Sequence, residues 1–246
     1  MHLKPIGSVQ SCFKQKFGTP RQSGIVSQSV AEIVIDPLWQ PELSLTGLSQ
    51  YSHLWVIFGF HQNGNYEFHG KVHPPRLKGE SVGLFATRSP HRPNPLGLSV
   101  VQIIRVLKDR ILVRGVDIID QTPVYDIKPY LPQVEALTDA KAELIESNPE
   151  QSVQVGWTLE ALADLESCFS KSEEVQKFSL GQTDLKKLIE DVVAQDPRPL
   201  VYRGFEGEKS PYREIHFFRL FDLDIHFKFD EALKASVIKL KIFTDL

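Results

Sequence analysis

The spacing of apolar residues predicts strands in the first half of the chain. Three stretches are rich in Val, Ile and Phe and are bounded by Gly or Pro, which is typical of strands: 24–35, 53–60 and 81–87. Residues 98–120 contain two β-branched runs on either side of Lys108 and Asp109, and this arrangement predicts a hairpin of undefined turn type. Residues 1–136 are therefore predicted to consist of strands and loops.

The first strand of this hairpin is apolar on both faces. One face carries Val101 and Ile103, and the other carries Val100, Ile104 and Val106. A strand that is apolar on both faces needs cover on both sides. A closed barrel would cover one face, and a second domain or a second subunit would cover the other.

Helical periodicity begins after about residue 137. Short helices are predicted over 138–146 and 159–169, and the stretch 183–193 has apolar residues at the i, i+3, i+4, i+7 and i+8 positions of a third helix, with Thr183 as its N-cap. Residues 212–229 return to aromatic-rich strand character. We therefore predict a mainly β chain, with a small β-barrel domain over residues 1–140 and a smaller α+β domain over residues 141–246.

Composition and charge narrow the classes of function. The 246 residues include two cysteines, far apart and without a CxxC pair, so a reducing cytoplasm is expected. The N-terminus lacks the apolar run of a secretory signal, and the run at 54–60 is too short to span a bilayer. Residues 70–128 hold ten Lys and Arg against five Asp and Glu, whereas residues 139–196 hold five against thirteen. This asymmetry indicates a local site for an anionic ligand, the alternative being scattered charge on a solvated surface.

The most unusual segment is GLFATRSPHRPNPLGLS at 83–99. Its three prolines exclude a helix interior and a central strand, and they restrict the residues before them to extended geometry. Such stiffness suits a loop that must hold Arg88, His91, Arg92 and Asn94 in fixed positions. An arginine fork matches a carboxylate or phosphate, and an asparagine amide matches an adenine edge. The alternative is a purely structural turn.

Three further polar segments accompany it: FGTPRQSGIVS at 17–27, HQNGNYEFHGKVHPPR at 61–76 and GVDIIDQTPVYDIKPYLP at 115–132. The last contains three carboxylates, Asp117, Asp120 and Asp126. Their spacing fits no standard cation loop, and the histidines at 61–76 fit no standard zinc site, so no metal is expected. Turn closure is the simpler role for Asp and Thr beside Pro.

These four segments, in this order, resemble the conserved blocks of the TsaA-like family, whose characterised members are TrmO-type tRNA N6-methyltransferases. DPRP at 196–199 is similar to the second domain of bacterial members, which is thought to help hold tRNA. The resemblance implies a β-barrel enzyme, unrelated to Rossmann methyltransferases, that uses S-adenosylmethionine. It also implies a homodimer with cofactor sites near the subunit interface. The implied reaction methylates N6-threonylcarbamoyladenosine at tRNA position 37.

The resemblance also carries site residues onto this chain. The positions that match cofactor contacts are Pro20, Arg21, Gln22, His61, Gln62, Arg92, Asp120, Gln121, Thr122 and Pro123. The family usually has Asp-Gly-Thr-Pro in the last turn, so Gln121 replaces a glycine. If that turn needs a positive φ, Gln121 is strained.

Methyl transfer to a urea-type nitrogen requires an acceptor for its proton, and Asp120, Tyr125, Asp126 and Tyr130 are the candidates. We expect Arg92 to grip the cofactor and the 120–130 segment to face the target base. The predicted substrate contacts are Arg88, Asn94, Lys128 and Arg198, extended by a basic track over Arg203, Lys209 and Arg213. Two alternatives are a methyltransferase of this fold acting on another small acceptor, and a non-enzymatic protein that binds cofactor or RNA.

Overall fold

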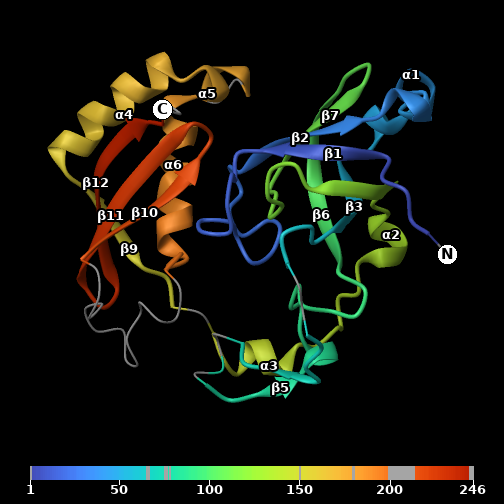
Figure 1. Cartoon of the computed structure of the whole chain (residues 1–246), viewed down its shortest axis with the longest axis horizontal. Helices are drawn as coiled ribbons and strands as arrows, with labels where there is room; N and C mark the ends of the chain where they lie inside the picture. The colour runs from blue at the N-terminus through green and yellow to red at the C-terminus, as the bar shows by residue number, and fades with distance from the viewer. Residues whose placement is uncertain are drawn as a thin grey trace.

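The computed structural model describes residues 2–64, 67–74, 77, 79–149, 151–178, 181–198 and 214–243. It places a closed β-barrel beside a four-stranded sheet that helices cover on one face (Figure 1).

Six antiparallel strands close the barrel in the order β1-β2-β7-β6-β3-β8. They are β1 Gly7–Ser11, β2 Val30–Ile35, β3 His53–Gly59, β6 Leu96–Val106, β7 Arg110–Arg114 and β8 Pro123–Pro129. In β3, alternation sends Leu54, Val56 and Phe58 into the core while His53 and Trp55 stay partly exposed. The predicted strand at 53–60 and the predicted hairpin are confirmed, and the hairpin turn closes where Leu107 N–H donates to Arg110 O at 2.8 Å.

Two strand predictions were too long. In the stretch 24–35 only β2 is extended, because Gly24 has a φ of 81° and Ser29 N–H turns back to Val26 O. In the stretch 81–87 only β5, Val82–Gly83, is a strand, paired with β4, Lys71–Val72, outside the barrel. A 3-10 turn follows at Leu84–Ala86, with Leu84 buried. Further 3-10 turns lie at Pro37–Trp39 and Leu48–Gln50, around the four-residue helix α1, Pro41–Ser44.

The C-terminal sheet has the order β10-β11-β12-β9, with β9 parallel to β12. Its strands are β9 Gln154–Trp157, β10 Ile215–Leu220, β11 Leu223–Glu231 and β12 Lys234–Ile242. Its helices are α4 Leu159–Lys171, α5 Glu173–Lys177 and α6 Gln182–Ala194. The fold class predicted from the sequence is confirmed, as are the helices at 159–169 and 183–193. The N-cap prediction was wrong: Gly181 occupies that position, and its N–H donates to the Asp184 carboxylate.

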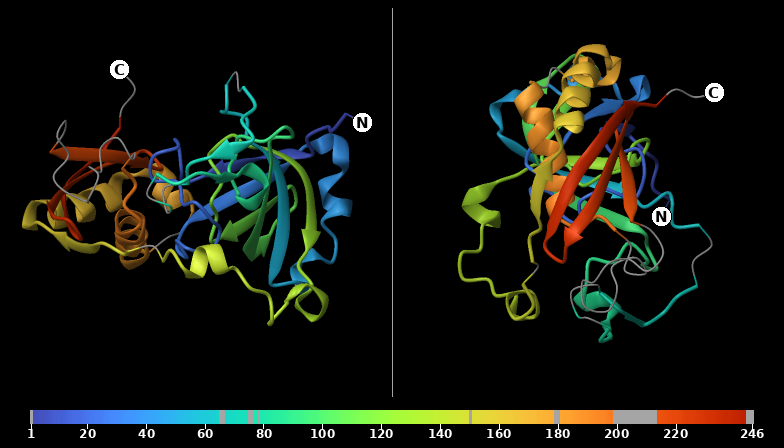
Figure 2. Two further views of the ribbon diagram at one scale, coloured as in Figure 1. Left: turned by 90° about the horizontal axis from the view of Figure 1, so that it is seen from below. Right: turned by 90° about the vertical axis from the view of Figure 1, so that its left-hand side faces the viewer.

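The helix predicted over 138–146 is reduced to α3, Glu143–Glu146, preceded by α2, Pro132–Glu135. Ile145 is 50% exposed and Leu144 is 39% exposed, so this segment has little apolar contact to stabilise a longer helix. The connection instead runs along the outside between the two β units (Figure 2).

A buried contact joins the barrel to the C-terminal sheet. Phe13, just after β1, forms a bridge with Leu220, and Phe221 N–H donates to Cys12 O at 2.7 Å. All four side chains are fully buried. The barrel core and the C-terminal core are therefore continuous.

Among the residues that the structure describes, none covers the outer face of β6 completely. Leu98 is 54% exposed and Ile104 is 41% exposed, whereas the inward-facing Val101 is buried. The sequence analysis expected either a second domain or a second subunit to cover this face. The described part of the C-terminal unit leaves Leu98 and Ile104 exposed.

Candidate functional site

Hydrogen bonds bring the four polar segments together at one end of the barrel. The ammonium of Lys16, the residue just before the first segment, donates to the backbone oxygen of Gln62 in the second segment at 2.7 Å. The neighbouring His61 ring nitrogen Nδ1 lies 3.3 Å from the Thr122 hydroxyl, which joins the second segment to the fourth. Residues from distant parts of the chain therefore share one site.

The proline-rich loop is tied to the same cluster. The Asn63 amide donates to Pro90 O at 2.8 Å, and the Arg88 guanidinium donates to the side-chain oxygen of Gln22. Arg88 and Gln22, predicted separately as substrate and cofactor contacts, are thus direct neighbours. Both lie at the surface, where a ligand could displace their mutual bond.

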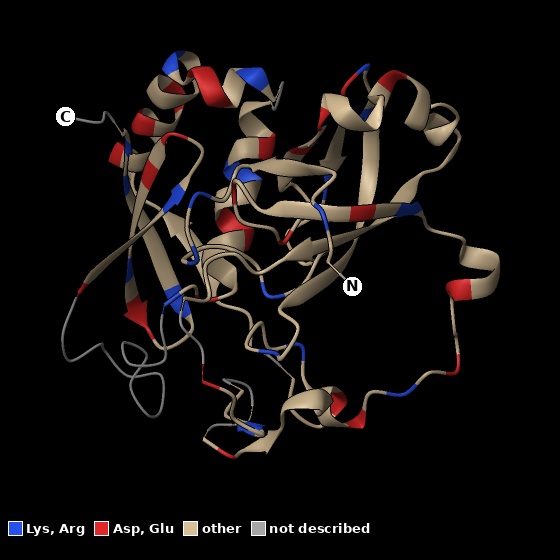
Figure 3. Ribbon diagram, turned by 45° about the vertical axis from the view of Figure 1, so that its right-hand side comes forward, with Lys and Arg blue, Asp and Glu red and all other residues tan. Residues whose placement is uncertain are grey.

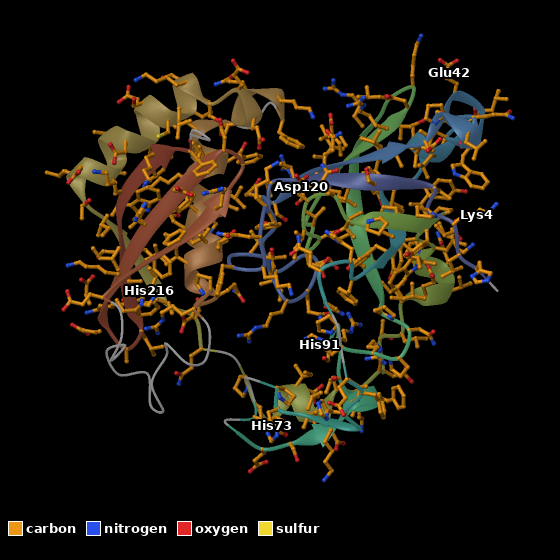
Figure 4. All side chains as sticks on the ribbon, viewed as in Figure 1. Lys4, Glu42, His73, His91, Asp120 and His216 are labelled. Atoms are coloured by element: carbon orange, nitrogen blue, oxygen red, sulfur yellow. The ribbon has the colours of Figure 1, made fainter. Side chains whose placement is uncertain are left out.

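Internal contacts shape the proline-rich loop. Arg92 donates to Thr87 O at 2.9 Å and lies 5.7 Å from the centre of the exposed Phe85 ring. The Thr87 hydroxyl in turn accepts the Ser89 N–H at 3.2 Å. Figure 4 places His91 of this loop on the side of the barrel that faces α3 and β5. The predicted stiffness therefore has a structural basis beyond the prolines themselves.

Asp117, which the sequence analysis considered only as one of three carboxylates for a metal or a turn, belongs to this cluster. Its carboxylate accepts a hydrogen bond from the Ser99 hydroxyl at 2.7 Å. Burial raises the pKa of Asp117, while the Ser99 hydroxyl, the Ser23 backbone and the Arg88 charge oppose that rise. A half-buried carboxyl that interacts with the Arg88 charge can help to position that guanidinium.

The turn at 120–123 is held firmly. One Asp120 carboxylate oxygen accepts Ser11 N–H at 2.7 Å, and the other lies 3.2 Å from the Lys14 ammonium. Gln121 has a φ of 61°, so the left-handed conformation considered from the sequence is present. Its N–H donates to Val9 O at 2.8 Å, which stabilises the turn despite the side chain. Figure 4 shows Asp120 where the barrel faces the C-terminal unit.

The other proton-acceptor candidates lie along β8. Asp126 and Lys128 form an ion pair at 3.0 Å on the outside of the barrel, and the Tyr130 ring meets Trp55 edge-on at 5.9 Å. Tyr125 lies over Gly59, where an added Cβ would come within 2.8 Å of its ring. The structure thus separates the four candidates into Asp120 at the loop cluster and three side chains along β8.

Among the remaining predicted cofactor positions, Pro20 and Thr122 are buried, Pro123 is half-buried, and Arg21, Gln62 and Gln121 are exposed. Asn94, a predicted substrate contact, is also exposed.

Arg198, a predicted substrate contact, is buried in this structure. Arg198 is 4% exposed, pairs with Asp196 at 2.8 Å and lies 3.5 Å from the Phe229 ring centre. Its guanidinium supports the C-terminal core and is not presented at the surface. The rest of the predicted basic track, Arg203, Lys209 and Arg213, lies outside the described residues.

Sequence reasoning missed the lysines that organise the cluster. Lys14 and Lys16 precede the Pro20 segment, but a contact with Asp120, 106 positions away, leaves no local pattern. In Figure 3, Lys and Arg positions recur along the loops between the two β units, while Asp and Glu mark the helices. Within the described part of the chain, there is no cluster of three or more His, Cys, Asp or Glu able to hold a metal ion, and no helix long and apolar enough to cross a membrane.

Comparison with known proteins assigns a family to this combination of closed barrel, loop cluster and helix-covered sheet. Residues 8–136 match the family model for the tRNA-methyltransferase O N-terminal domain, and residues 150–242 match that for the TrmO C-terminal domain. The chain belongs to the TrmO family.

Individual relatives agree with this assignment. A tRNA (adenine(37)-N6)-methyltransferase of Escherichia coli is 37% identical over 89% of this chain and 91% of its own length. A putative S-adenosylmethionine-dependent methyltransferase of Pseudomonas aeruginosa is 36% identical over 92% of both chains. The crystal structure of TrmO from P. aeruginosa superposes with a TM-score of 0.77 at 30% identity, covering 98% of each chain. The family and the enzyme class predicted from the sequence are confirmed, and the relatives' names include the predicted cofactor.

Proposed function

We propose that this protein methylates N6 of adenosine 37 in tRNA when that base carries a threonylcarbamoyl group, with S-adenosylmethionine as donor. The observation that carries the proposal is the joining of all four family segments into one hydrogen-bonded cluster at the barrel end. Membership of the TrmO family supports the reaction class. Because tRNA is the substrate, the proposal agrees with the expected cytoplasmic location.

The chemistry of the cluster fits the cofactor. S-adenosylmethionine has a carboxylate, ribose hydroxyls and an adenine ring, and it supplies a methyl group on a positively charged sulfur. Arg21, Gln22, His61, Gln62 and Arg92 offer guanidinium, amide and imidazole groups on loops that fixed backbone contacts hold. Arginine forks bind carboxylates and amides bind base edges, so this donor set matches the ligand.

The remaining task of the chain is to hold the target nitrogen in line and to accept its proton. Asp120 is oriented by Ser11 and Lys14, and Asp126 is oriented by Lys128. Tyr125 and Tyr130 are the other candidate acceptors. The exposed Arg88, Asn94 and Lys128 are proposed to contact the RNA near this site, with the unit over 141–246 as a second support for tRNA.

A homodimer is part of the proposal. The exposed apolar outer face of β6, with Leu98 and Ile104, supports it because large apolar side chains on a barrel strand are stabilised by a partner surface.

Nucleoside mass spectrometry tests the reaction. The purified protein is incubated with S-adenosylmethionine and tRNA from cells that lack this activity, and the digest is examined for one added methyl on threonylcarbamoyladenosine. We expect that product together with S-adenosylhomocysteine. Cofactor binding without either product would favour a sensor, and turnover on a different acceptor would favour the first alternative.

The same assay distinguishes the proton acceptors. Asp120→Asn and Asp126→Asn are compared with Tyr125→Phe and Tyr130→Phe at saturating substrates. Loss of the acceptor lowers kcat by about 100-fold or more with KM little changed. Equal, small effects in all four variants would exclude a side-chain base from this set.

A further inference from the structure

The carboxylate of Asp120, in the turn at 120–123, has a partner that the C-terminal unit holds in place. One Asp120 oxygen accepts the Ser11 N–H at 2.7 Å, and the other lies 3.2 Å from the Lys14 ammonium. The same ammonium lies 3.0 Å from the carboxylate of Glu174, which belongs to α5. Asp120 of the barrel and Glu174 of the C-terminal unit therefore share one cation.

We propose that Lys14 and Glu174 are positioning residues for the methyl transfer: Glu174 fixes the Lys14 ammonium, which in turn holds the Asp120 carboxylate as the proton acceptor. The inference rests on the proposed function, and it chooses Asp120 among the four candidate acceptors. As the target nitrogen gains the methyl group, the electron pair of the broken methyl–sulfur bond stays on sulfur, and the N–H proton passes to Asp120. Helix α5 thus completes the site in the barrel.

The Asp120 side chain keeps the capacity to accept a proton. A carboxylate has about four acceptor positions, and Ser11 and Lys14 each use one of them, on different oxygens. The side chain is also 18% exposed. The backbone holds the turn by its own bonds, since Asp120 N–H donates to Phe13 O at 2.8 Å. The ammonium is therefore needed to orient the carboxylate and not to form the turn.

The other carboxylate among the candidates is held less firmly. Asp126 pairs with Lys128 at 3.0 Å, but these side chains are 46% and 64% exposed. Exposed pairs of this kind contribute little because water and salt compete with them. The Lys14 side chain is 25% exposed, and a partly buried pair is screened less. Asp120 is therefore the carboxylate with the better-defined orientation.

Glu174 is suited to keep the ammonium in place. Its Oε2 oxygen, which faces Lys14, is buried from solvent although the side chain as a whole is 39% exposed. A buried charged oxygen is costly without a partner, so this oxygen favours a nearby ammonium. Burial lowers the pKa of Lys14, but Glu174 and Asp120 raise it by more. The ammonium therefore stays charged at neutral pH.

Helix α5 is itself anchored to the barrel. At its start, the Ser172 hydroxyl accepts the Val175 N–H at 3.1 Å and donates to the Asp222 carboxylate. Asp222 follows Phe221, whose N–H donates to Cys12 O at 2.7 Å. These contacts lead from α5 back to the chain just after β1, close in sequence to the lysine that the helix holds. The helix is thus a fixed point for that lysine.

A second ion pair between the units provides a matched control. Lys177, also on α5, pairs with Glu32 of β2 at 3.0 Å and donates to the side-chain oxygen of Gln10 at 2.7 Å. Its side chain is 44% exposed, similar to that of Glu174. Neither of its partners belongs to the four polar segments. Lys177→Met therefore removes an ion pair between the units without touching Asp120.

The test measures kcat and KM for methylation of threonylcarbamoyladenosine in tRNA. Glu174→Gln should lower kcat about 10-fold, and Lys14→Met should lower it further, because a misplaced acceptor slows proton removal. KM for both substrates should change by less than about twofold, since binding is not affected. Lys177→Met should keep the wild-type kcat. Lys14→Arg retains a cation for both carboxylates and should recover most of the activity.

A double-variant cycle separates positioning from a purely structural role. In the Asp120→Asn background, Glu174→Gln should lower kcat no further, because the group that it positions is already absent. Calorimetry should show that Glu174→Gln and Lys177→Met bind S-adenosylmethionine like the wild type.

Four results would overturn the inference while the proposed function stands: wild-type kcat in Lys14→Met and Glu174→Gln, wild-type kcat in Asp120→Asn, an equal loss in Lys177→Met, or an undiminished effect of Glu174→Gln in the Asp120→Asn background. Weakened cofactor binding in Glu174→Gln with unchanged kcat would overturn it as well. If the wild-type protein forms no methylated product, both the inference and the proposed function are overturned.

Discussion

Gln121 adopts a left-handed conformation that its side chain disfavours, and a backbone hydrogen bond to Val9 holds it there. That conformation costs roughly 1–2 kcal/mol for a residue with a Cβ, and glycine adopts it freely at some cost in unfolded-state entropy. Gln121→Gly should therefore raise the free energy of unfolding by about 0.5–1 kcal/mol. Urea denaturation measures this. Gln121→Ala keeps the strain and is the control, and a glycine variant no more stable than the alanine variant would contradict the argument.

Asp117 gives a pH dependence of known sign. Because burial raises its pKa above the ordinary 3.8, its charged form is disfavoured in the folded state. The stability it provides is complete below pH 3.8 and is lost as pH rises through the folded-state pKa. The unfolding free energy of the wild type minus that of Asp117→Asn should thus fall as the pH rises above 3.8 and through the folded-state pKa. Urea midpoints across that range measure it.

Ser99→Ala serves as the companion variant for this test. Removing the Ser99 hydroxyl takes away a hydrogen-bond donor that favours the charged carboxylate. The free energy of unfolding should therefore fall more with rising pH in Ser99→Ala than in the wild type. If the unfolding free energy of the wild type minus that of Asp117→Asn stays constant with pH, the raised pKa of Asp117 is refuted.

At the scale of elements, Lys14 links three of them. It follows β1, pairs with Asp120 at 3.2 Å and pairs with Glu174 of α5 at 3.0 Å. Burial lowers the pKa of Lys14, but the Glu174 and Asp120 carboxylates more than offset this, so the pKa is raised. Lys14 thus connects the site turn to the C-terminal helices.

Lys14→Met removes both partially exposed pairs and should lower the free energy of unfolding by about 1 kcal/mol. Glu174→Gln removes one pair and should lower it by about half as much. Chemical denaturation of both single variants and the double variant gives the coupling energy. Additive losses, with no coupling between the two positions, would count against the link.

Sequence patterns predicted elements where burial is one-sided and regular. β3 alternates cleanly, the β6–β7 hairpin consists of two β-branched runs around a polar turn, and α6 has five buried residues at helical spacing. The strand predicted over 81–87 was too long because its apolar residues belong to a loop, in which Leu84 is buried and Phe85 is exposed. The sequence showed which polar and charged residues lie in the loops of the site. It did not show their hydrogen-bond partners, because these come from distant segments. The sequence offered Asp117 only as one of three clustered carboxylates and did not single out Lys14, because their side-chain partners Ser99 and Asp120 lie in other segments or at other positions of the chain. The motif DPRP at 196–199 gives no sign that Arg198 is buried.

At the scale of the whole molecule, the uncovered face of β6 predicts association. Leu98→Glu should convert the protein from a dimer to a monomer in sedimentation experiments, because it places a charge on the apolar surface. Leu159→Glu, at an 87% exposed position on α4, is the control and should stay dimeric. A monomeric wild-type protein would rule out this interface.

The buried joint between Phe13 and Phe221 has a consequence for substrate choice. Because a continuous core fixes the two β units relative to each other, the distance from the C-terminal sheet to the barrel loops is fixed in the molecule. If one tRNA contacts both units, the enzyme selects the tRNA by the distance between the two contacted regions as well as by the base. A tRNA whose anticodon arm is shortened by a few base pairs would then contact only one unit at a time, even with the correct nucleotide 37.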